Sequence, residues 1–154
     1  MRLRKRVPSA KLLGCTHLDG YELRFNKVGW RDGSAKCNIV PNEQRIYLAI
    51  YEILEVERAI LDELEGVGSG YDSTELEIDG FGACSTYVAE QGAIDEVLRP
   101  MDWYKEMVLL GCVVNEFPEF YVRSIEAVST AEDSNENRAR EQWEIVEELR
   151  RAAY

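Results

Sequence analysis

Short apolar runs and apolar/polar alternation fill the first ninety residues, which is the pattern of β-strands. Residues 72–78 alternate, with Leu76 and Ile78 apolar against Glu75 and Glu77, and this predicts a half-buried strand. Residues 45–54 are β-branched and aromatic with few charges, which predicts a buried strand. Further strands are predicted at residues 11–17, 21–27, 37–40 and 81–89.

Turn signals separate these strands. Asp19-Gly20 lies between the first two apolar runs, and such a pair predicts a tight hairpin. Pro41-Asn42 closes the short strand at residues 37–40, and Asp79-Gly80 predicts a turn before the strand at residues 81–89.

Beyond residue 100 the apolar residues recur every three or four positions, which is helical spacing. Asp102 is the expected N-cap of a helix that ends at Gly111, and Phe117-Pro118 is expected to open the next one. Residues 131–137 are polar and acidic and predict a mobile linker. The apolar stripes of the three helices are Trp103, Met107 and Leu110; Tyr121, Ile125 and Val128; and Trp143, Val146 and Leu149.

One further helix is predicted within the strand region, over residues 55–65. Its apolar residues Ile60, Leu61 and Leu64 share a face, and Gly66 is a common helix stop. Glu65 lies four residues after Leu61, so it lies beside this apolar face rather than opposite it. The helix therefore places a carboxylate in its last turn.

The position of Glu65 gives it candidate chemistry. In a last turn the helix macrodipole disfavours negative charge by about 0.3–1 kcal/mol, and partial burial acts in the same direction. Glu65 is therefore a candidate general base near neutral pH. Gly66, Gly68 and Gly70 let the backbone bend closely around a small ligand. The alternative is a helix C-cap followed by a flexible turn.

The charge balance excludes some functions. The 154 residues carry a net charge of −11, which favours solubility and argues against a general nucleic-acid binder. Eight of the 18 Lys/Arg residues lie within residues 1–31, near Tyr21, Phe25 and Trp30, which offers an RNA-binding alternative. No nucleic-acid motif accompanies them, so we expect no nucleic-acid partner.

The cysteine and histidine content predicts no metal site. Cys15, Cys37, Cys84 and Cys112 are widely spaced, and His17 is the one histidine, so no zinc-ligand spacing occurs. Sparse cysteines suggest reduced thiols and a cytoplasmic protein, and no apolar segment is long enough for a membrane span. We expect no metal, no cofactor and no membrane partner.

Strands before residue 90 and helices after it predict an α+β fold, most simply a small mixed or antiparallel β-barrel with flanking helices. We expect a single domain over residues 1–130, followed by the linker and a C-terminal amphipathic helix over residues 131–154.

Short segments spaced along residues 6–125 form a further pattern. They are Arg-Val-Pro-Ser-Ala at 6–10, Leu-Asp-Gly-Tyr-Glu-Leu-Arg-Phe at 18–25, Lys-Cys-Asn-Ile at 36–39, residues 46–53 with Tyr51-Glu52, Leu61-Asp62 through Glu65-Gly66-Val67 to Gly70-Tyr71, Thr86-Tyr87, and Trp103-Tyr104-Lys105 followed by Pro118 and Tyr121. In this order and spacing they resemble the gamma-glutamylcyclotransferase family.

The resemblance implies a small β-barrel with flanking helices and an intramolecular aminolysis. The free α-amine of a gamma-glutamyl group attacks its own side-chain amide carbonyl, which forms 5-oxoproline and releases an amine or amino acid. Glutathione derivatives, gamma-glutamyl amino acids and gamma-glutamylamines share this head group, so the substrate stays open among them.

The resemblance also implies site residues. The family's catalytic carboxylate matches Glu65, which would act as general acid/base. The substrate would contact Gly66 and Tyr87, with Tyr71 at the rim, although both tyrosines have the alternative of being ordinary barrel aromatics. Asp62 and Glu63 are alternative acids that we expect to be solvated.

The sequence departs from the family in one important respect. Members carry an N-terminal strand that ends in a Tyr-Gly-Ser-Asn loop, whose backbone amides are expected to hold the substrate α-carboxylate. This strand and loop are not found here, and Leu48 stands where glycine is usual.

Three explanations stay open: a start further upstream, a natural truncation without activity, or substitution of the loop by residues 1–6. The alternative function is a catalytically inactive barrel that binds a small molecule or serves as an interaction module. The open sheet edge also makes a homodimer an expectation.

Overall fold

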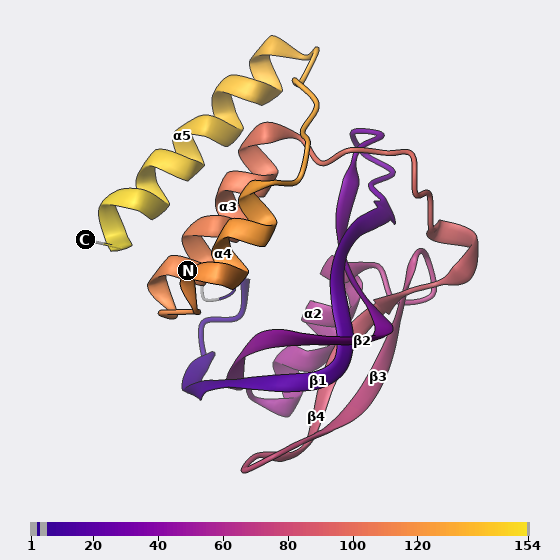
Figure 1. Ribbon diagram of the computed structural model, residues 1–154, viewed down its shortest axis with the longest axis vertical. Coiled ribbons are helices and arrows are strands. Elements are labelled where there is room, and N and C mark those ends of the chain that lie inside the picture. Colours follow the sequence, from indigo (N-terminus) through magenta and orange to yellow (C-terminus); the bar gives the residue numbers. More distant parts are fainter. Residues whose placement is uncertain (1–2, 4–5, 154) are drawn as a thin grey trace.

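The computed structural model describes residue 3 and residues 6–153 (Figure 1). The described set leaves out residues 1, 2, 4, 5 and 154. Most of the segment 1–6, one candidate substitute for the Tyr-Gly-Ser-Asn loop, therefore lies outside it. The elements are β1 (Lys11–Val28), β2 (Ala35–Glu52), α2 (Glu55–Glu65), β3 (Tyr71–Ile78), β4 (Gly82–Ala89), a 3₁₀ turn (Gln91–Ala93), α3 (Asp102–Val114), α4 (Glu119–Glu126) and α5 (Glu136–Ala153).

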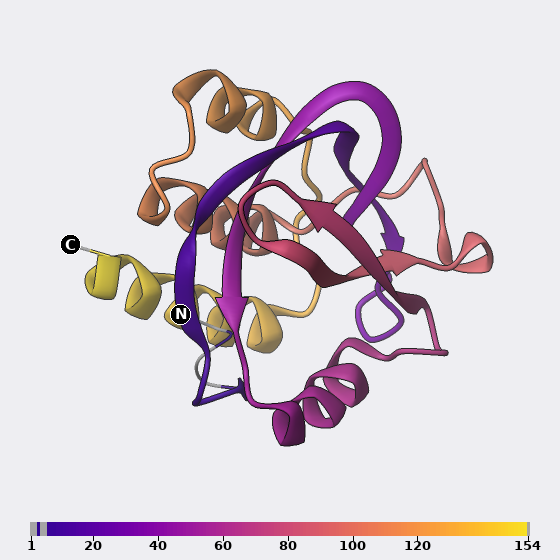
Figure 2. The same cartoon turned by 90° about the horizontal axis from the view of Figure 1, so that it is seen from below.

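Strands β1 and β2 form one long antiparallel hairpin, so the tight hairpin predicted at Asp19-Gly20 is wrong. Asp19 pairs with Arg45 and Tyr21 with Pro41, and Gly20 lies between them at a shift in the pairing register, with φ 86°. A glycine with positive φ suits a bulge as well as a turn, so the strand bends and continues. Figure 2 shows the strong curvature of this hairpin.

Strands β3 and β4 form a second antiparallel hairpin, which confirms the strands predicted at residues 72–78 and 81–89 and the turn predicted at Asp79-Gly80. The described strands thus make two separate two-stranded sheets. Barrel closure needs a continuous ladder of backbone hydrogen bonds, whereas side chains connect β2 to the second hairpin here. Asn38 Oδ1 accepts from the Ala89 N–H at 2.9 Å, and the Tyr71 hydroxyl donates to the Cys37 carbonyl at 2.5 Å. The α+β class is confirmed, and the described residues form no closed barrel.

Helices α3, α4 and α5 lie together, apart from α2 (Figures 1 and 2). Trp103, Met107 and Leu110 of α3 pack with Val146 and Leu149 of α5 in a buried apolar cluster, which confirms both predicted stripes. A second cluster, centred on Cys112, Tyr121 and Ile125, joins α3 and α4 to the β1–β2 hairpin.

Two predicted boundaries of α3 are wrong. The helix continues past Gly111 to Val114, because Gly111 is tolerated inside a helix whose neighbouring turns pack well. Its N-cap is Met101, and Asp102 is the first helical residue, with Oδ1 accepting from the Trp103 N–H at 2.7 Å.

Helix α2 has the predicted bounds and an unexpected orientation. Val56, Ile60 and Leu64 are 76%, 48% and 46% exposed, so these apolar side chains face solvent rather than the core. The half-buried face instead carries residues at i, i+1, i+4, i+5 and i+8, which are neighbours on a helix. These are Glu57, Arg58, Leu61, Asp62 and Glu65.

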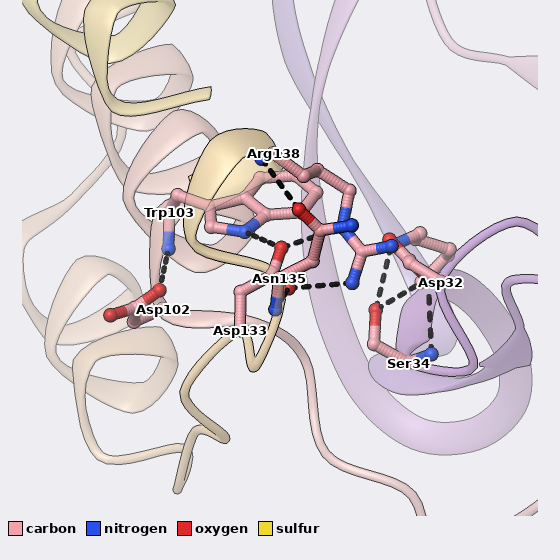
Figure 3. A network of polar contacts seen from close by, with 8 residues as sticks. Asp32, Ser34, Asp102, Trp103, Asp133, Asn135 and Arg138 are labelled. Carbon is pink, nitrogen blue, oxygen red and sulfur yellow. Dashed lines mark hydrogen bonds and ion pairs between the residues drawn. The ribbon is translucent and has the colours of Figure 1, made fainter. Parts of the chain in front are cut away.

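A polar network ties the segment after α4 to the helical layer. Figure 3 shows Asp133 between the indole of Trp103 and the guanidinium of Arg138, close to the β1–β2 connection with Asp32 and Ser34. Trp103 Nε1 donates to Asp133 at 3.1 Å, and Arg138 Nη2 donates at 2.6 Å. The mobility of residues 131–137 stays a prediction, although this anchor lies within them. Within the described part of the chain, no helix is both long enough and apolar enough to cross a membrane.

Candidate functional site

The site is built around the C-terminal end of α2. Gly66 takes the left-handed conformation, with φ 75° and ψ 47°, and its N–H donates to the carbonyls of Asp62 and Glu63 at 3.0 and 3.2 Å. This is the glycine cap that the sequence predicts. The chain turns at once into β3, where the Gly68 N–H donates to the Tyr71 carbonyl at 2.9 Å. Glu65 and Tyr71 are therefore joined by a short, fixed turn.

The inward face of α2 is polar because each of its polar residues bonds to another element. The Tyr87 hydroxyl donates to Asp62 Oδ1 at 2.6 Å, so the expectation that Asp62 is solvated is wrong. Glu63 on the opposite side is exposed, as expected. The remaining contacts of this face are Arg6 to Glu65, the Ser9 hydroxyl to Glu57, and Arg58 to the Ser73 hydroxyl.

Tyr71 and Tyr87 lie on one face of the β3–β4 hairpin. Tyr71 is opposite Ala89 and Tyr87 is opposite Ser73, and directly opposed residues in antiparallel strands point to the same side. Because Tyr87 bonds to Asp62, this face meets the polar face of α2. The structure thus brings Tyr71, Tyr87 and Glu65 to the same junction.

The charge of Glu65 acts on both tyrosines. Burial raises the pKa of Tyr71, and its electrostatic interactions with the Cys37 and Glu65 side chains raise it further. Burial also raises the pKa of Tyr87, with added contributions from its hydrogen bond to Asp62 and from the charges of Asp62 and Glu65. Both phenols stay protonated at neutral pH and act as hydrogen-bond donors. Their roles toward a substrate stay predictions, as does that of Gly66.

Arg6 is a partner of Glu65 that the sequence pattern did not assign. Its Nη1 donates to Glu65 Oε1 at 2.8 Å, with the two side chains 35% and 30% exposed. An ion pair with this exposure is worth about 0–1 kcal/mol, so a ligand cation can displace Arg6 at low cost. Arg6 holds the carboxylate in place without sealing it.

Sequence reasoning missed Arg6 as a site neighbour and named Asp62 only as an alternative acid expected to be solvated, although both lie in segments that carry the family resemblance. The order of these segments along the chain indicates that both residues belong to the family pattern. It does not indicate that Arg6 pairs with Glu65, 59 residues away, or that Asp62 pairs with Tyr87, 25 residues away.

A separate apolar cavity of about 250 Å³ lies between the β1–β2 hairpin and helices α3 and α4. Tyr47, Val108 and Phe117 are among its lining residues, and no carboxylate lines it. It therefore offers no carboxylate as acid/base, and the α2 junction remains the candidate for chemistry. Among the described residues, no three His, Cys, Asp or Glu side chains cluster as metal ligands would.

Solved structures share this fold. A structure named gamma-glutamyl cyclotransferase matches with a TM-score of 0.82 and 20% identity, over 96% of this chain and 90% of that one. An uncharacterized protein from Homo sapiens matches with a TM-score of 0.78 and 21% identity, over 95% and 90% of the two chains. YkqA from Bacillus subtilis matches with a TM-score of 0.65 and 20% identity, over 84% of this chain and 49% of that one.

No family model matches the sequence, and neither does any curated protein. The structural likeness is nevertheless extensive along both chains. The protein is therefore an α+β protein with the gamma-glutamyl cyclotransferase fold, which confirms the fold family that the sequence resemblance indicated; the closed barrel that it also implied is not confirmed.

Proposed function

We propose that the protein cyclises a gamma-glutamyl group to 5-oxoproline and releases an amine or amino acid, with Glu65 as general acid/base. The substrate is a small gamma-glutamyl compound, and the reaction needs no cofactor. The observation that carries the proposal is the end of α2, where Gly66 caps the helix directly after Glu65 and the charge of Glu65 contributes to the raised pKa of both Tyr71 and Tyr87.

The chemistry requires one bond to form and one to break. The substrate α-amine nitrogen bonds to the side-chain carbonyl carbon, which closes a five-membered ring, and the original amide C–N bond then breaks. Glu65 takes a proton from the attacking amine and returns one to the leaving nitrogen. Holding the substrate folded can supply about 7–11 kcal/mol at best, because the attack is intramolecular.

Product analysis with matched substrates tests the proposal. Gamma-glutamyl-alanine should yield 5-oxoproline and alanine in equal amounts. Its N-acetyl derivative has no free amine, and α-glutamyl-alanine has no side-chain amide, so neither should react. Release of alanine together with glutamate would indicate hydrolysis and would contradict cyclisation.

A non-catalytic binding module is the second candidate, and the Arg6–Glu65 ion pair favours it. Arg6 occupies the carboxylate that the reaction needs. The variant Arg6→Gln frees Glu65 and separates the two candidates. If both the unsubstituted chain and this variant bind gamma-glutamyl-alanine in calorimetry but release no 5-oxoproline, the binding module is the better account.

A further inference from the structure

Two nitrogen donors converge on Gly70, in the turn that follows Glu65. A Cβ atom at Gly70 would lie 3.1 Å from Lys27 Nζ and 3.2 Å from Trp30 Nε1. Gly70 has φ 132°, a conformation that favours glycine, so backbone geometry and the close approach of Lys27 and Trp30 both disfavour a side chain here. Because residue 70 has no side chain, the Lys27 ammonium and the Trp30 indole N–H both approach the backbone there, and the two donors lie close to each other.

Lys27 is a buried ammonium without a counter-ion in contact. It is 7% exposed, and among the described residues no hydrogen bond or ion pair reaches its Nζ, which lies 4.6 Å from the centroid of the Tyr71 ring. Burial lowers its pKa, as expected for a charge that lacks a close partner. Buried charges are ordinarily paired, so this arrangement calls for an anion.

The space remains accessible to a ligand. No described side-chain nitrogen or oxygen is both sealed from solvent and unbonded, so Lys27 Nζ keeps an opening. Trp30 is 67% exposed, and no described residue accepts from its indole N–H. An anion that approaches from solution would therefore meet two donors that no described residue already uses.

The surrounding structure fixes Lys27 in place. The register of β1 against β2 shifts between Phe25 and Lys27, which leaves Asn26 as a bulge, and bulges redirect neighbouring side chains. Asn26 is buried and bonded to Glu96 and Asn38, so the bulge is rigid. Tyr71, whose ring lies under the ammonium, is held by its bond to the Cys37 carbonyl.

The charges around Lys27 favour a monoanion. Glu65 exerts the strongest influence of any charged group on Lys27, followed by Lys36, Glu90 and Asp32. The three carboxylates would repel a dianion such as phosphate more strongly than a carboxylate, which presents a single charge and two oxygens for two donors.

We propose that Lys27 and Trp30 bind the α-carboxylate of the gamma-glutamyl group and so position its α-amine at Glu65. This inference rests on the proposed function for the identity of its ligand. In a gamma-glutamyl compound one carbon carries both the amine and the carboxylate. A carboxylate held beside Gly70 therefore keeps the amine near the carboxylate that takes its proton.

Binding of the product tests the site without turnover. The probes are 5-oxoproline and 2-pyrrolidinone, which has the same ring without the carboxylate, and the readout is the Trp30 indole N–H resonance, assigned with Trp30→Phe. We expect 5-oxoproline to shift this resonance and 2-pyrrolidinone not to do so. Lys27→Met should weaken 5-oxoproline binding about 10- to 100-fold, while Lys11→Met, at an exposed strand position, should leave it unchanged.

Kinetics separate this inference from the proposed reaction. Lys27→Met should raise KM for gamma-glutamyl-alanine about 10- to 100-fold, with a smaller change in kcat. If the chain releases 5-oxoproline and Lys27→Met leaves both KM and product binding unchanged, the inference is wrong and the reaction stands. If no gamma-glutamyl compound reacts but 5-oxoproline binds through Lys27, the reaction is wrong and the carboxylate site stands.

A second pair of variants covers the case in which Lys27→Met does not fold, which circular dichroism would show. Trp30→Phe removes one exposed donor and should weaken 5-oxoproline binding several-fold, measured by calorimetry. Lys27→Arg keeps the charge but changes the donor geometry, so it should also weaken binding. Unchanged dissociation constants for both variants would overturn the inference.

Discussion

Helices α2 and α3 are similar in length, but α3 buries its apolar face and α2 exposes most of its own. Helix α3 buries Trp103, Met107 and Leu110 in the helical layer, as its apolar stripe predicts. Helix α2 buries no residue fully and turns Ile60 and Leu64 toward solvent. The face of α2 that meets the rest of the molecule is polar, and it carries the candidate acid/base.

The difference shows how the fold separates stability from chemistry. Burying a leucine side chain contributes about 1.5–3 kcal/mol, so the stripe of α3 supplies stability. The half-exposed ion pair of Glu65 on α2 contributes little stability, yet it orients a carboxylate toward the β3–β4 hairpin. The amphipathic pattern of a helix predicts its buried face only where packing, rather than bonding, fixes the helix.

The largest expected effect comes from matched leucine truncations. Leu110→Ala should lower the free energy of unfolding by about 2–5 kcal/mol, because Leu110 is buried at 7% exposure. Leu64→Ala should change it by less than about 1 kcal/mol, because Leu64 is 46% exposed. Urea unfolding of both variants measures the difference. If both variants lost the same free energy of unfolding, Leu64 would have to be buried in solution, and the exposure of the apolar stripe of α2 would be wrong.

A smaller effect is expected from the polar anchor of α3. Asp133→Asn should lower the free energy of unfolding by about 1–3 kcal/mol, since it weakens charged hydrogen bonds from Arg138 and Trp103. Glu132→Gln, at an exposed neighbouring position, is the control and should have no measurable effect. If the two variants unfolded at the same urea concentration, the anchor would contribute nothing.

The same anchor should make the free energy of unfolding depend on pH. The Arg138 hydrogen bonds lower the pKa of Asp133 to about 2, below its ordinary value of 3.8. The contribution is therefore complete above about pH 4 and is lost as the pH falls toward 2. Unfolding curves between pH 5 and 2 should converge for the unsubstituted chain and Asp133→Asn. A gap that stays constant over this range would contradict the assignment.

The smallest expected effects have opposite signs at two glycines. Gly66→Ala should cost about 1 kcal/mol, because residue 66 has φ 75° at the end of α2. Gly111→Ala should stabilise by about 0.5–1 kcal/mol, because residue 111 is helical and its Cβ would meet open space. Thermal unfolding followed by circular dichroism measures both changes. A loss at Gly111 would mean that the middle of α3 requires a glycine.

Much of the fold was readable from local signals. Gly66 marks the end of α2, alternation marks β3, and helical spacing marks the buried stripes of α3 and α5. Gly20 misled the prediction because a glycine with positive φ serves both a turn and a bulge, and only the pairing partner distinguishes them.

The site was only partly readable for a related reason. Glu65 has a local signal, a carboxylate before a capping glycine, and the family resemblance points to the same residue. Arg6 and Lys27 have none, because one reaches Glu65 across 59 residues and the other is redirected by a bulge at Asn26. Contacts between segments distant in sequence depend on tertiary packing, which no local pattern encodes.

The most direct measurement is the rate of 5-oxoproline release from gamma-glutamyl-alanine by the unsubstituted chain, Glu65→Gln and Glu63→Gln. Glu63 lies on the exposed side of the same helix turn and is the matched control. The account predicts a loss of about 10²- to 10⁴-fold for Glu65→Gln alone, with little change in melting temperature. Equal rates for all three chains would contradict Glu65 as the acid/base and leave it as a helix-end carboxylate paired with Arg6.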